Sequence, residues 1–156
     1  MLLIMVNMVH QRGKLIGIAI APKRHAKMKC QDTALVSPEC GISGDSRGKR
    51  KKRQVTILFE DDWSDVCSDL GESLHWTARR ANFLVGGGVR APQIIGTILV
   101  INNLLLRVNG ETDPCAVMDY SRMGLQKALM SDWRGGVCCT VIEGGSASIG
   151  DIVTLK

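Results

Sequence analysis

Aromatic residues are scarce in this chain, at 4% of 156 positions, and the signatures of several protein classes are missing. The apolar stretch at residues 1–9 is too short to span a bilayer. No two cysteines have Cys-x-x-Cys spacing, and no histidine stands at ligand spacing from a cysteine. The glycine-rich segments match neither a phosphate-binding loop nor a dinucleotide fingerprint, and no Gly-x-Ser-x-Gly elbow is present. These absences disfavour a membrane-spanning protein, a structural zinc module, a nucleotide-binding fold and a serine hydrolase.

The size and composition indicate one domain. A chain of this length buries a sizeable core without metal or disulfide links, and 45% apolar with 22% charged residues is typical of globular proteins. We expect one domain over residues 1–156, with residues 1–13 as a first strand or an extension, and a turn at residues 10–13. No basic segment precedes the apolar start and no cleavage site follows it, so we expect a reducing, cytoplasmic location with six free cysteines.

Short strands dominate the apolar pattern. Ile16, Ile18 and Ile20 alternate with small or polar positions before Pro22, which is typical of a half-buried strand. Asn102-Asn103 suits a two-residue hairpin turn between two apolar runs. Residues 33–36 and 55–59 show the same half-buried pattern, and further strands are predicted at residues 97–101, 104–108, 137–142 and 152–155.

Only two segments have helical spacing. Trp63, Val66, Cys67 and Leu70 follow acidic residues and precede Gly71, which predicts a capped amphipathic helix. A shorter helix is predicted around residues 125–129. Because no β-α-β unit repeats, we expect a mainly β fold, a closed or nearly closed antiparallel or mixed barrel with a few short helices.

Positive charge is concentrated in one run. The net charge is +5, and Lys49–Arg53 alone supplies five positive charges, so the rest of the chain is neutral. The run lacks the interleaved aromatic residues that would stack on bases, so nucleic acid is not the expected partner. We interpret it as solvated surface or as a loop that attracts an anionic ligand or partner.

Cys115 occupies a position that suits chemistry. It follows Pro114 in the polar loop after a predicted strand, where its sulfur would be accessible. A thiolate near helix-start amides or an arginine would be a nucleophile or a soft metal ligand. Neighbouring Glu111 and Asp113 oppose that ionisation, and spacing alone also allows a half-buried structural cysteine.

Several short segments in a fixed order resemble the MOSC family, named after the C-terminal domain of molybdenum cofactor sulfurase. The resemblance extends from about Lys14 to Leu155. It is carried by Gly41-Ile42-Ser43-Gly44-Asp45, Arg53-Gln54-Val55-Thr56-Ile57-Leu58, Arg79-Arg80-Ala81-Asn82, Asp113-Pro114-Cys115, Arg134-Gly135-Gly136-Val137, Gly144-Gly145 and Gly150-Asp151.

The resemblance implies a barrel of the MOSC and pyruvate kinase β-barrel kind and a reactive Cys115. In the family this cysteine is thought to carry persulfide sulfur from a pyridoxal-phosphate-dependent desulfurase, or to ligate molybdenum. Arg79, Arg80 and Asn82 match a segment whose guanidinium groups would hold the pterin phosphate of the molybdenum cofactor; a surface ion-pair cluster is the alternative interpretation.

One position departs from the family pattern. Many relatives have histidine soon after Gly-Asp, whereas this chain reads Asp45-Ser46-Arg47. An arginine there binds an anion and cannot shuttle protons. We count Asp45 and Arg47 among the expected cofactor-binding residues.

Three functions remain open at this level. The first is a sulfur carrier or molybdenum cofactor-binding domain, acting through Cys115 as a sulfur transferase with a cysteine desulfurase or a molybdoenzyme as partner. Pyridoxal phosphate would then come only with that partner, because the chain is too short to include a desulfurase domain. The second is a molybdenum-dependent reductase of N-hydroxylated compounds, which needs an electron-donating partner. The third is a non-catalytic module that uses loop 47–53 on an acidic partner; neither nucleic acid nor a membrane is an expected partner, and the sequence leaves substrate and oligomeric state open.

Overall fold

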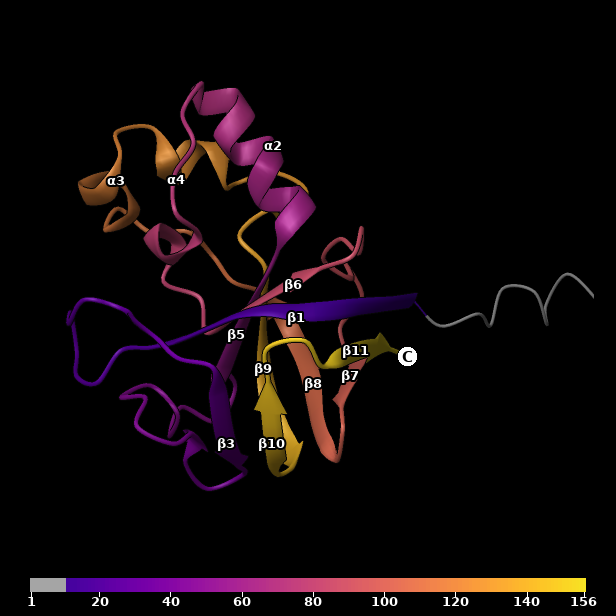
Figure 1. Cartoon of the computed structure of the whole chain (residues 1–156). Coiled ribbons are helices and arrows are strands. Elements are labelled where there is room, and N and C mark those ends of the chain that lie inside the picture. Colours follow the sequence, from indigo (N-terminus) through magenta and orange to yellow (C-terminus); the bar gives the residue numbers. More distant parts are fainter. Residues whose placement is uncertain (1–10) are drawn as a thin grey trace, which may run out of the picture.

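The computed structural model describes residues 11–156, and its centre is a closed barrel of seven strands (Figure 1). Of the strand or extension predicted at residues 1–13, residues 1–10 lie outside the described residues. Around the barrel the strand order is β11-β7-β8-β9-β5-β6-β1, and β1 closes the ring by pairing with β11. The strands are β1 (Gln11–Ile20), β5 (Val55–Phe59), β6 (Phe83–Gly86), β7 (Ile98–Ile101), β8 (Leu104–Glu111), β9 (Val137–Glu143) and β11 (Ile152–Leu155).

The barrel is mixed because one pair of neighbours is parallel. β5 runs parallel to β6, and the chain connects them through the helix that follows β5. The neighbours β7 and β8 form the predicted hairpin, whose turn residue Asn102 has a positive φ of 54°. The expectation of a mainly β, closed barrel with a few short helices is therefore confirmed.

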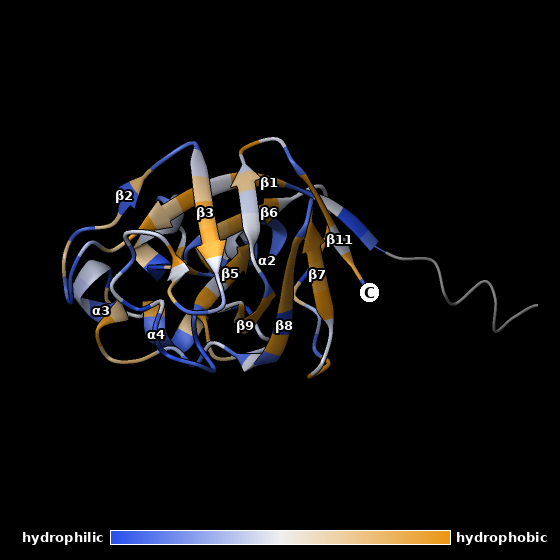
Figure 2. Cartoon of the chain, turned by 90° about the horizontal axis from the view of Figure 1, so that it is seen from below, coloured by the Kyte–Doolittle hydropathy of each residue, from blue (hydrophilic) through white to orange (hydrophobic). Residues whose placement is uncertain are grey.

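A small second sheet packs against the barrel core. It consists of β3 (Thr33–Ser37), β4 (Gly41–Ile42) and β10 (Gly145–Ser148), in the order β10-β3-β4. Its apolar residues Ala34, Val36 and Ala147 are buried in the same cluster as the interior of the barrel. A two-residue strand, β2 (Lys29–Cys30), pairs with the end of β1. Figure 2 shows that the hydrophobic residues concentrate on the barrel strands.

Helices cover one side of the barrel. α2 (Glu60–Leu70), the 3-10 turn η1 (Trp76–Arg79), α3 (Met118–Ser121) and α4 (Leu125–Ala128) lie there (Figure 1). α2 is the predicted amphipathic helix, and Gly71 ends it with a φ of 65°. Along residues 11–156 no helix combines the length and apolar character that crossing a bilayer requires.

The helical layer explains why β5 is buried on both faces. Ile57 and Phe59 point into the barrel cluster, whereas Leu58 packs with Trp63 and Leu125 under the helices. The sequence pattern predicted a half-buried strand, and this was wrong because both faces of β5 meet an apolar layer. The same layer buries Leu84 of the neighbouring strand β6.

The start of β1 also differs from the prediction. Residues 11–13 were expected in a turn, but they extend the strand because they pair with β11, with Gln11 opposite Leu155. The alternation of isoleucines is broken by a register shift between Leu15 and Gly17. As a result Ile18 lies in the barrel cluster and Ile16 packs under the helices.

Candidate functional site

A cavity of about 390 Å³ opens beside the helical layer, and segments that are far apart in the sequence form its wall. The β1–β2 connection contributes Ala21 and residues 23–25, and the loop after β4 contributes Ser46, Arg47, Arg50 and Arg53. The end of η1, Thr56 of β5, the loop after β8 with the start of α3, and Gly135 before β9 complete it. Cys115 lines this cavity.

The lining is strongly cationic. Seven positively charged side chains contribute to it, together with His25, and none of residues 11–156 adds a carboxylate to the wall. A partly enclosed space with one sign of charge concentrates counter-ions. The seven are Lys23, Arg24, Arg47, Arg50, Arg53, Arg79 and Arg80.

Arg79 is the most deeply buried of these cations, at 4% exposure. Its Nε donates to the carbonyl of Gly135 at 2.9 Å, and its Nη2 donates to the carbonyl of Thr112 at 2.7 Å. Burial and the nearby charge of Arg53 together lower the pKa of Arg79 to about 10, while Cys115 acts in the opposite direction. Arg79 thus remains charged at neutral pH, and no carboxylate among the described residues forms an ion pair with it. The alternative of a surface ion-pair cluster is wrong for this residue.

The two glycines before β9 make room for Arg79. A Cβ atom on Gly135 would lie 2.7 Å from the carbonyl oxygen of Thr112 and 3.2 Å from Nη2 of Arg79. Gly136 has a φ of 88°, and a Cβ there would lie 2.0 Å from the carbonyl oxygen of Ile57. Only glycine therefore fits at these two positions, where the backbone approaches the carbonyl groups of Thr112 and Ile57. This close approach explains the two glycines of the Arg134-Gly135-Gly136 segment.

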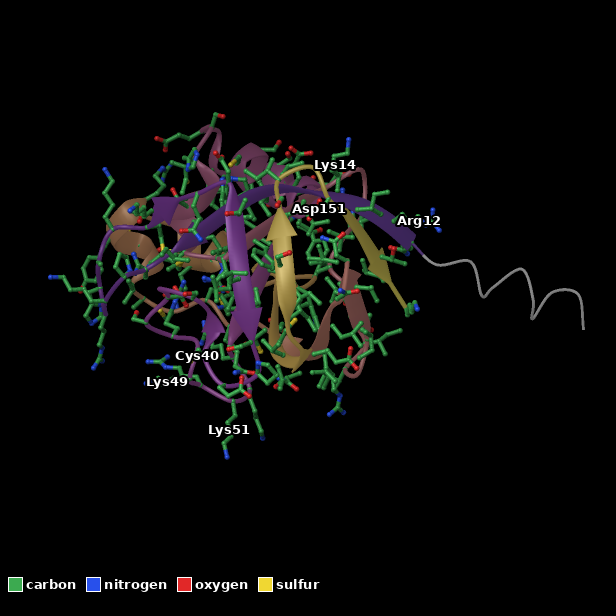
Figure 3. All side chains as sticks on the ribbon, turned by 60° about the horizontal axis from the view of Figure 1, so that its bottom comes forward. Arg12, Lys14, Cys40, Lys49, Lys51 and Asp151 are labelled. Atoms are coloured by element: carbon green, nitrogen blue, oxygen red, sulfur yellow. The ribbon has the colours of Figure 1, made fainter. Side chains whose placement is uncertain are left out.

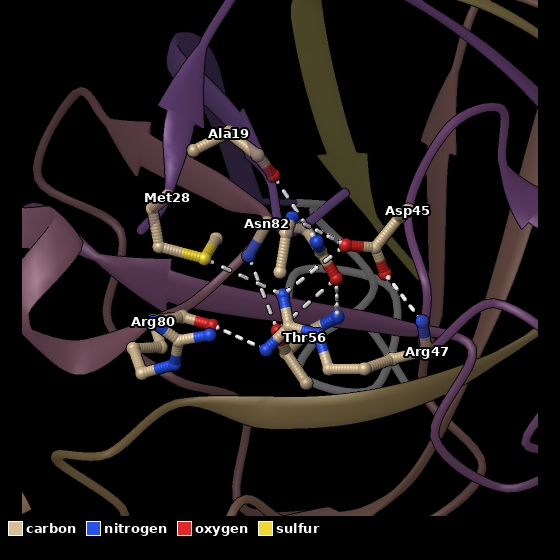
Figure 4. Close-up of polar contacts among 8 residues, drawn as sticks. Ala19, Met28, Asp45, Arg47, Thr56, Arg80 and Asn82 are labelled. Atoms are coloured by element: carbon tan, nitrogen blue, oxygen red, sulfur yellow. Dashed lines mark hydrogen bonds and ion pairs between the residues drawn. The ribbon is translucent and has the colours of Figure 1, made fainter. Parts of the chain in front are cut away.

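Buried Asp45 and half-buried Arg47 form a second unit (Figure 4). Asp45 accepts from the backbone N–H of Ala21 at 2.8 Å and pairs with Nη2 of Arg47 at 3.4 Å. Arg47 Nη1 donates to the carbonyl of Arg80 at 2.8 Å. Burial lowers the pKa of Arg47, whereas Asp45 raises it. Asp45 itself is not part of the cavity wall, so it fixes the position of Arg47 from behind.

Asn82 likewise lies outside the cavity wall and joins strands instead. It is 1% exposed; its Oδ1 accepts from the N–H of Thr56 at 3.0 Å, and its Nδ2 donates to the carbonyl of Ala19 at 3.1 Å (Figure 4). These bonds leave the side chain no exposed edge for a ligand. Arg80, two residues earlier, has a left-handed φ of 64° after η1, and it lines the cavity.

Cys115 is an exposed thiol in the loop between β8 and α3, as the sequence predicted. Cys30 and Cys40 are also exposed, but neither lines the cavity. Cys139 is fully buried in β9, and burial raises its pKa. Cys138 on the opposite face of β9 is half-buried, and burial raises its pKa as well.

Sequence reasoning missed several residues of the wall, among them Arg50, Arg53 and Thr112. Arg50 and Arg53 belong to the basic run, which was interpreted as solvated surface or as a loop that attracts an anionic ligand or partner, without a place in a cavity. Thr112 is 4% exposed, and its hydroxyl has no hydrogen-bond partner within residues 11–156. Nε of Arg47 is the other buried side-chain atom of this part of the chain without a partner. Both unpaired groups belong to cavity residues, which leaves hydrogen-bond capacity for a ligand.

A bare metal ion finds few ligands here. Within the described residues no three His, Cys, Asp or Glu side chains gather in a way that could hold a metal. Cys115 is the one thiol of the cavity wall. A larger cavity of about 840 Å³ lies beside Arg12, Gly87 and Lys156, and its lining contains neither cysteine nor histidine.

Residues 24–154 match the family model of the MOSC domain. The chain belongs to the MOSC family. No curated protein shows significant sequence similarity to this MOSC domain.

Solved structures share the fold of this MOSC domain at low sequence identity. The YuaD protein from Bacillus subtilis superposes with a TM-score of 0.79 at 19% identity, covering 94% of this chain and 97% of the other. YiiM from Escherichia coli gives 0.72 at 16% identity over 94% of this chain and 70% of the other. YiiM from Geobacillus stearothermophilus gives 0.74 at 14% identity over 92% and 75%. These likenesses establish the barrel and its connections.

Proposed function

We propose that this MOSC domain is a sulfur carrier or molybdenum cofactor-binding domain that works through Cys115. One observation carries the proposal: an exposed thiol lines a cavity whose wall holds seven cations and, among the described residues, no carboxylate. A thiolate is nucleophilic toward sulfane sulfur and is a soft ligand for a high-valent metal. The surrounding cations favour anionic ligands in the space next to this thiol.

The residues of the cavity fit the molybdenum cofactor. Its phosphate needs cationic donors, and Arg79, Arg80 and Arg47 would hold it. The unpaired Thr112 hydroxyl and Arg47 Nε match a ligand rich in acceptors. Because no metal-binding cluster is present within residues 11–156, the metal would be held by the cofactor and by Cys115. The cofactor would supply a redox-active metal, while the protein binds and orients it.

Asp45 and Asn82 support this site without touching the ligand. Asp45 holds Arg47 by an ion pair, and Asn82 links β1, β5 and β6 next to the segment that carries Arg79 and Arg80. We expect substitutions at both positions to act through the geometry of the arginines.

The sulfur-carrier branch requires Cys115 to bind sulfur as a persulfide. A cysteine desulfurase with its own pyridoxal phosphate would be one donor, and a molybdoenzyme would be one acceptor. The exposed sulfur and the open cavity allow such a partner to approach. The cations would stabilise the persulfide anion after transfer.

Replacing Cys115 by serine tests both branches. Cys115→Ser should unfold at the wild-type midpoint, because the side chain is exposed, but it should accept no sulfur from a desulfurase and retain no molybdenum in a molybdenum-replete host. Cys40→Ser is the matched control, since that thiol is exposed outside the cavity. Full sulfur loading and metal retention in Cys115→Ser would exclude both branches and favour the partner-binding module. Activity of a molybdenum-loaded wild type on an N-hydroxylated base, with a reductant, would instead identify the reductase.

A further inference from the structure

The cavity around Cys115 bears on where a carried sulfur would come from. Its volume of about 390 Å³ is within the range of small-molecule sites. Seven cations line it, and the described residues add no carboxylate to the wall. A small anionic molecule therefore matches the space beside the thiol in both size and charge.

Thr112 adds a second, independent sign of a ligand. Its side chain is 4% exposed, its hydroxyl has no partner within residues 11–156, and it lines the cavity with Cys115. Its carbonyl is already bonded to Nη2 of Arg79 at 2.7 Å. A buried hydroxyl without a partner is costly unless a ligand accepts a hydrogen bond from it, so Thr112 offers a donor to an oxyanion beside the positive charge of Arg79.

We propose that Cys115 accepts sulfur from a small anionic sulfane donor of the thiosulfate class bound in this cavity, an inference that rests on the proposed sulfur-carrier role. The Cys115 thiolate attacks the outer sulfur of thiosulfate, and a new S–S bond forms. The S–S bond of the donor breaks, and sulfite leaves with the electron pair as a dianion. Cys115 is left as a persulfide anion, so atoms and charge balance without an external oxidant. A second thiolate then takes the outer sulfur and restores Cys115.

The cations explain why this reaction would need the cavity. A thiolate and a dianion repel each other, and the leaving sulfite carries the full double charge. Fixed guanidinium groups offset both effects in a partly enclosed site more strongly than they would in water. Cys40 is also exposed but lies outside the cavity, so its sulfur lacks these fixed groups in an enclosed site.

The test uses the full reduced chain with thiosulfate whose outer sulfur is labelled. Mass mapping of peptides measures the label on each cysteine, and released sulfite is measured in parallel. We expect label on Cys115, equimolar sulfite and far slower labelling of Cys40. A neutral dialkyl trisulfide should not distinguish the two cysteines, because it gains nothing from the positive charge.

Two threonine variants separate the site from a general effect of charge. Thr112→Val keeps the shape of the side chain and removes the unpaired hydroxyl, so it should slow Cys115 loading by roughly tenfold or more, as expected for a lost hydrogen bond to a charged group, at an unfolding midpoint no lower than that of the wild type. Thr154→Val, on β11 outside the cavity wall, should load at the wild-type rate.

Each outcome decides something. Equal loading of Cys115 and Cys40, or an unchanged rate in Thr112→Val, overturns the inference. If thiosulfate loads no sulfur but a cysteine desulfurase loads Cys115, the small-donor inference fails and the proposed function stands. If neither donor loads Cys115, the sulfur-carrier role fails with it.

Discussion

The interior of the barrel and the cavity beside it are built on opposite principles. The barrel interior is filled by aliphatic residues and two phenylalanines with almost no exposure, and the cysteine that packs among them, Cys139, is fully buried. The cavity is lined by charge, includes an exposed cysteine, and leaves two buried polar atoms without partners among the described residues. The apolar interior stabilises the fold, and its cysteine is out of reach of a ligand. The cavity keeps unpaired polar atoms and clustered positive charge, which destabilise the ligand-free protein and which a bound anion would offset.

The difference shows how the fold tolerates a buried cation. Arg79 is held by two carbonyl groups instead of a carboxylate, and those carbonyls belong to the loops on either side of it. The rigid barrel positions both loops, because β8 and β9 pair along their length before those loops diverge. The apolar interior therefore supplies enough stability for the fold to tolerate the buried charge in the cavity wall.

The comparison predicts its largest effect in thiol reactivity. Cys139 lies in the central part of β9 and its pKa is raised by burial, so an alkylating reagent reaches it only when the strand opens, at a cost close to global unfolding, about 5–15 kcal/mol. Cys115 is exposed, so the reagent should reach it without any opening of the barrel. Timed labelling under native conditions, with peptide mapping, measures both rates in one molecule. Comparable rates would mean that β9 opens readily and that the barrel is not the rigid part.

A core truncation should come next in size. Phe83 is fully buried in the barrel, and Phe83→Ala should lower the free energy of unfolding by about 3–5 kcal/mol, because it leaves a cavity. Tyr120→Ala, at 89% exposure on α3 of the helical layer, is the aromatic control and should change it by less than about 0.5 kcal/mol. Denaturant unfolding measures both. A similar loss in the two variants would contradict the assignment of stability to the barrel.

The strands of the barrel could be predicted from the sequence better than the residues that line the cavity. The strands β7, β8, β9 and β11 and the helix α2 follow from apolar spacing and turn residues, because each pattern is local. β6 was missed because the Gly86-Gly87-Gly88 segment obscures a four-residue strand. Thr112 and Arg53 were missed because membership of the cavity depends on which loops the barrel brings together. Cys115 and Arg79 were found through the family resemblance, and no local pattern explains why Arg79 is buried.

Removing the buried cation should have a smaller effect on stability than on binding. Arg79→Met relieves a buried charge without a carboxylate partner but leaves two carbonyls unpaired, so we expect opposing terms and a net change within about 2 kcal/mol. Retention of an anionic cofactor should be lost. Because the folded-state pKa of Arg79, about 10, is below its usual value of 12.5, burial of the charge costs stability at lower pH, and this cost falls as the pH rises through that range.

Comparison with Arg79→Met measures the direction of this pH dependence. The free energy of unfolding of the wild type minus that of Arg79→Met should increase between about pH 9 and about pH 11, since only the wild type loses a buried charge there. Groups common to both proteins cancel in this difference. A difference that stays constant or falls would show that Arg79 is paired with an anionic group in the folded protein.

Substitutions in the basic run Lys49–Arg53 should have the smallest effects on stability. The side chains of this run lie on two faces. Arg50 and Arg53 line the cavity, whereas Lys49 and Lys51 point outward next to Cys40 (Figure 3). The backbone of the run is fixed independently of these side chains, since Asn109 Nδ2 donates to the carbonyl of Lys52 at 2.8 Å and Thr140 Oγ1 donates to that of Lys51 at 2.5 Å. Glutamine at any of the five positions should therefore change the free energy of unfolding by less than about 0.5 kcal/mol.

Anion binding should distinguish the two faces. The double variant Arg50→Gln with Arg53→Gln should weaken binding of a probe such as pyrophosphate severalfold, because it removes two charges from the cavity wall. The triple variant Lys49→Gln, Lys51→Gln and Lys52→Gln removes more charge, yet it should weaken binding less, and that small loss should disappear at high salt because exposed charges are screened. Titration of both variants at two ionic strengths measures this. A larger loss of affinity in the triple variant would show that the run acts as a uniform charged surface and that the anion binds outside the cavity.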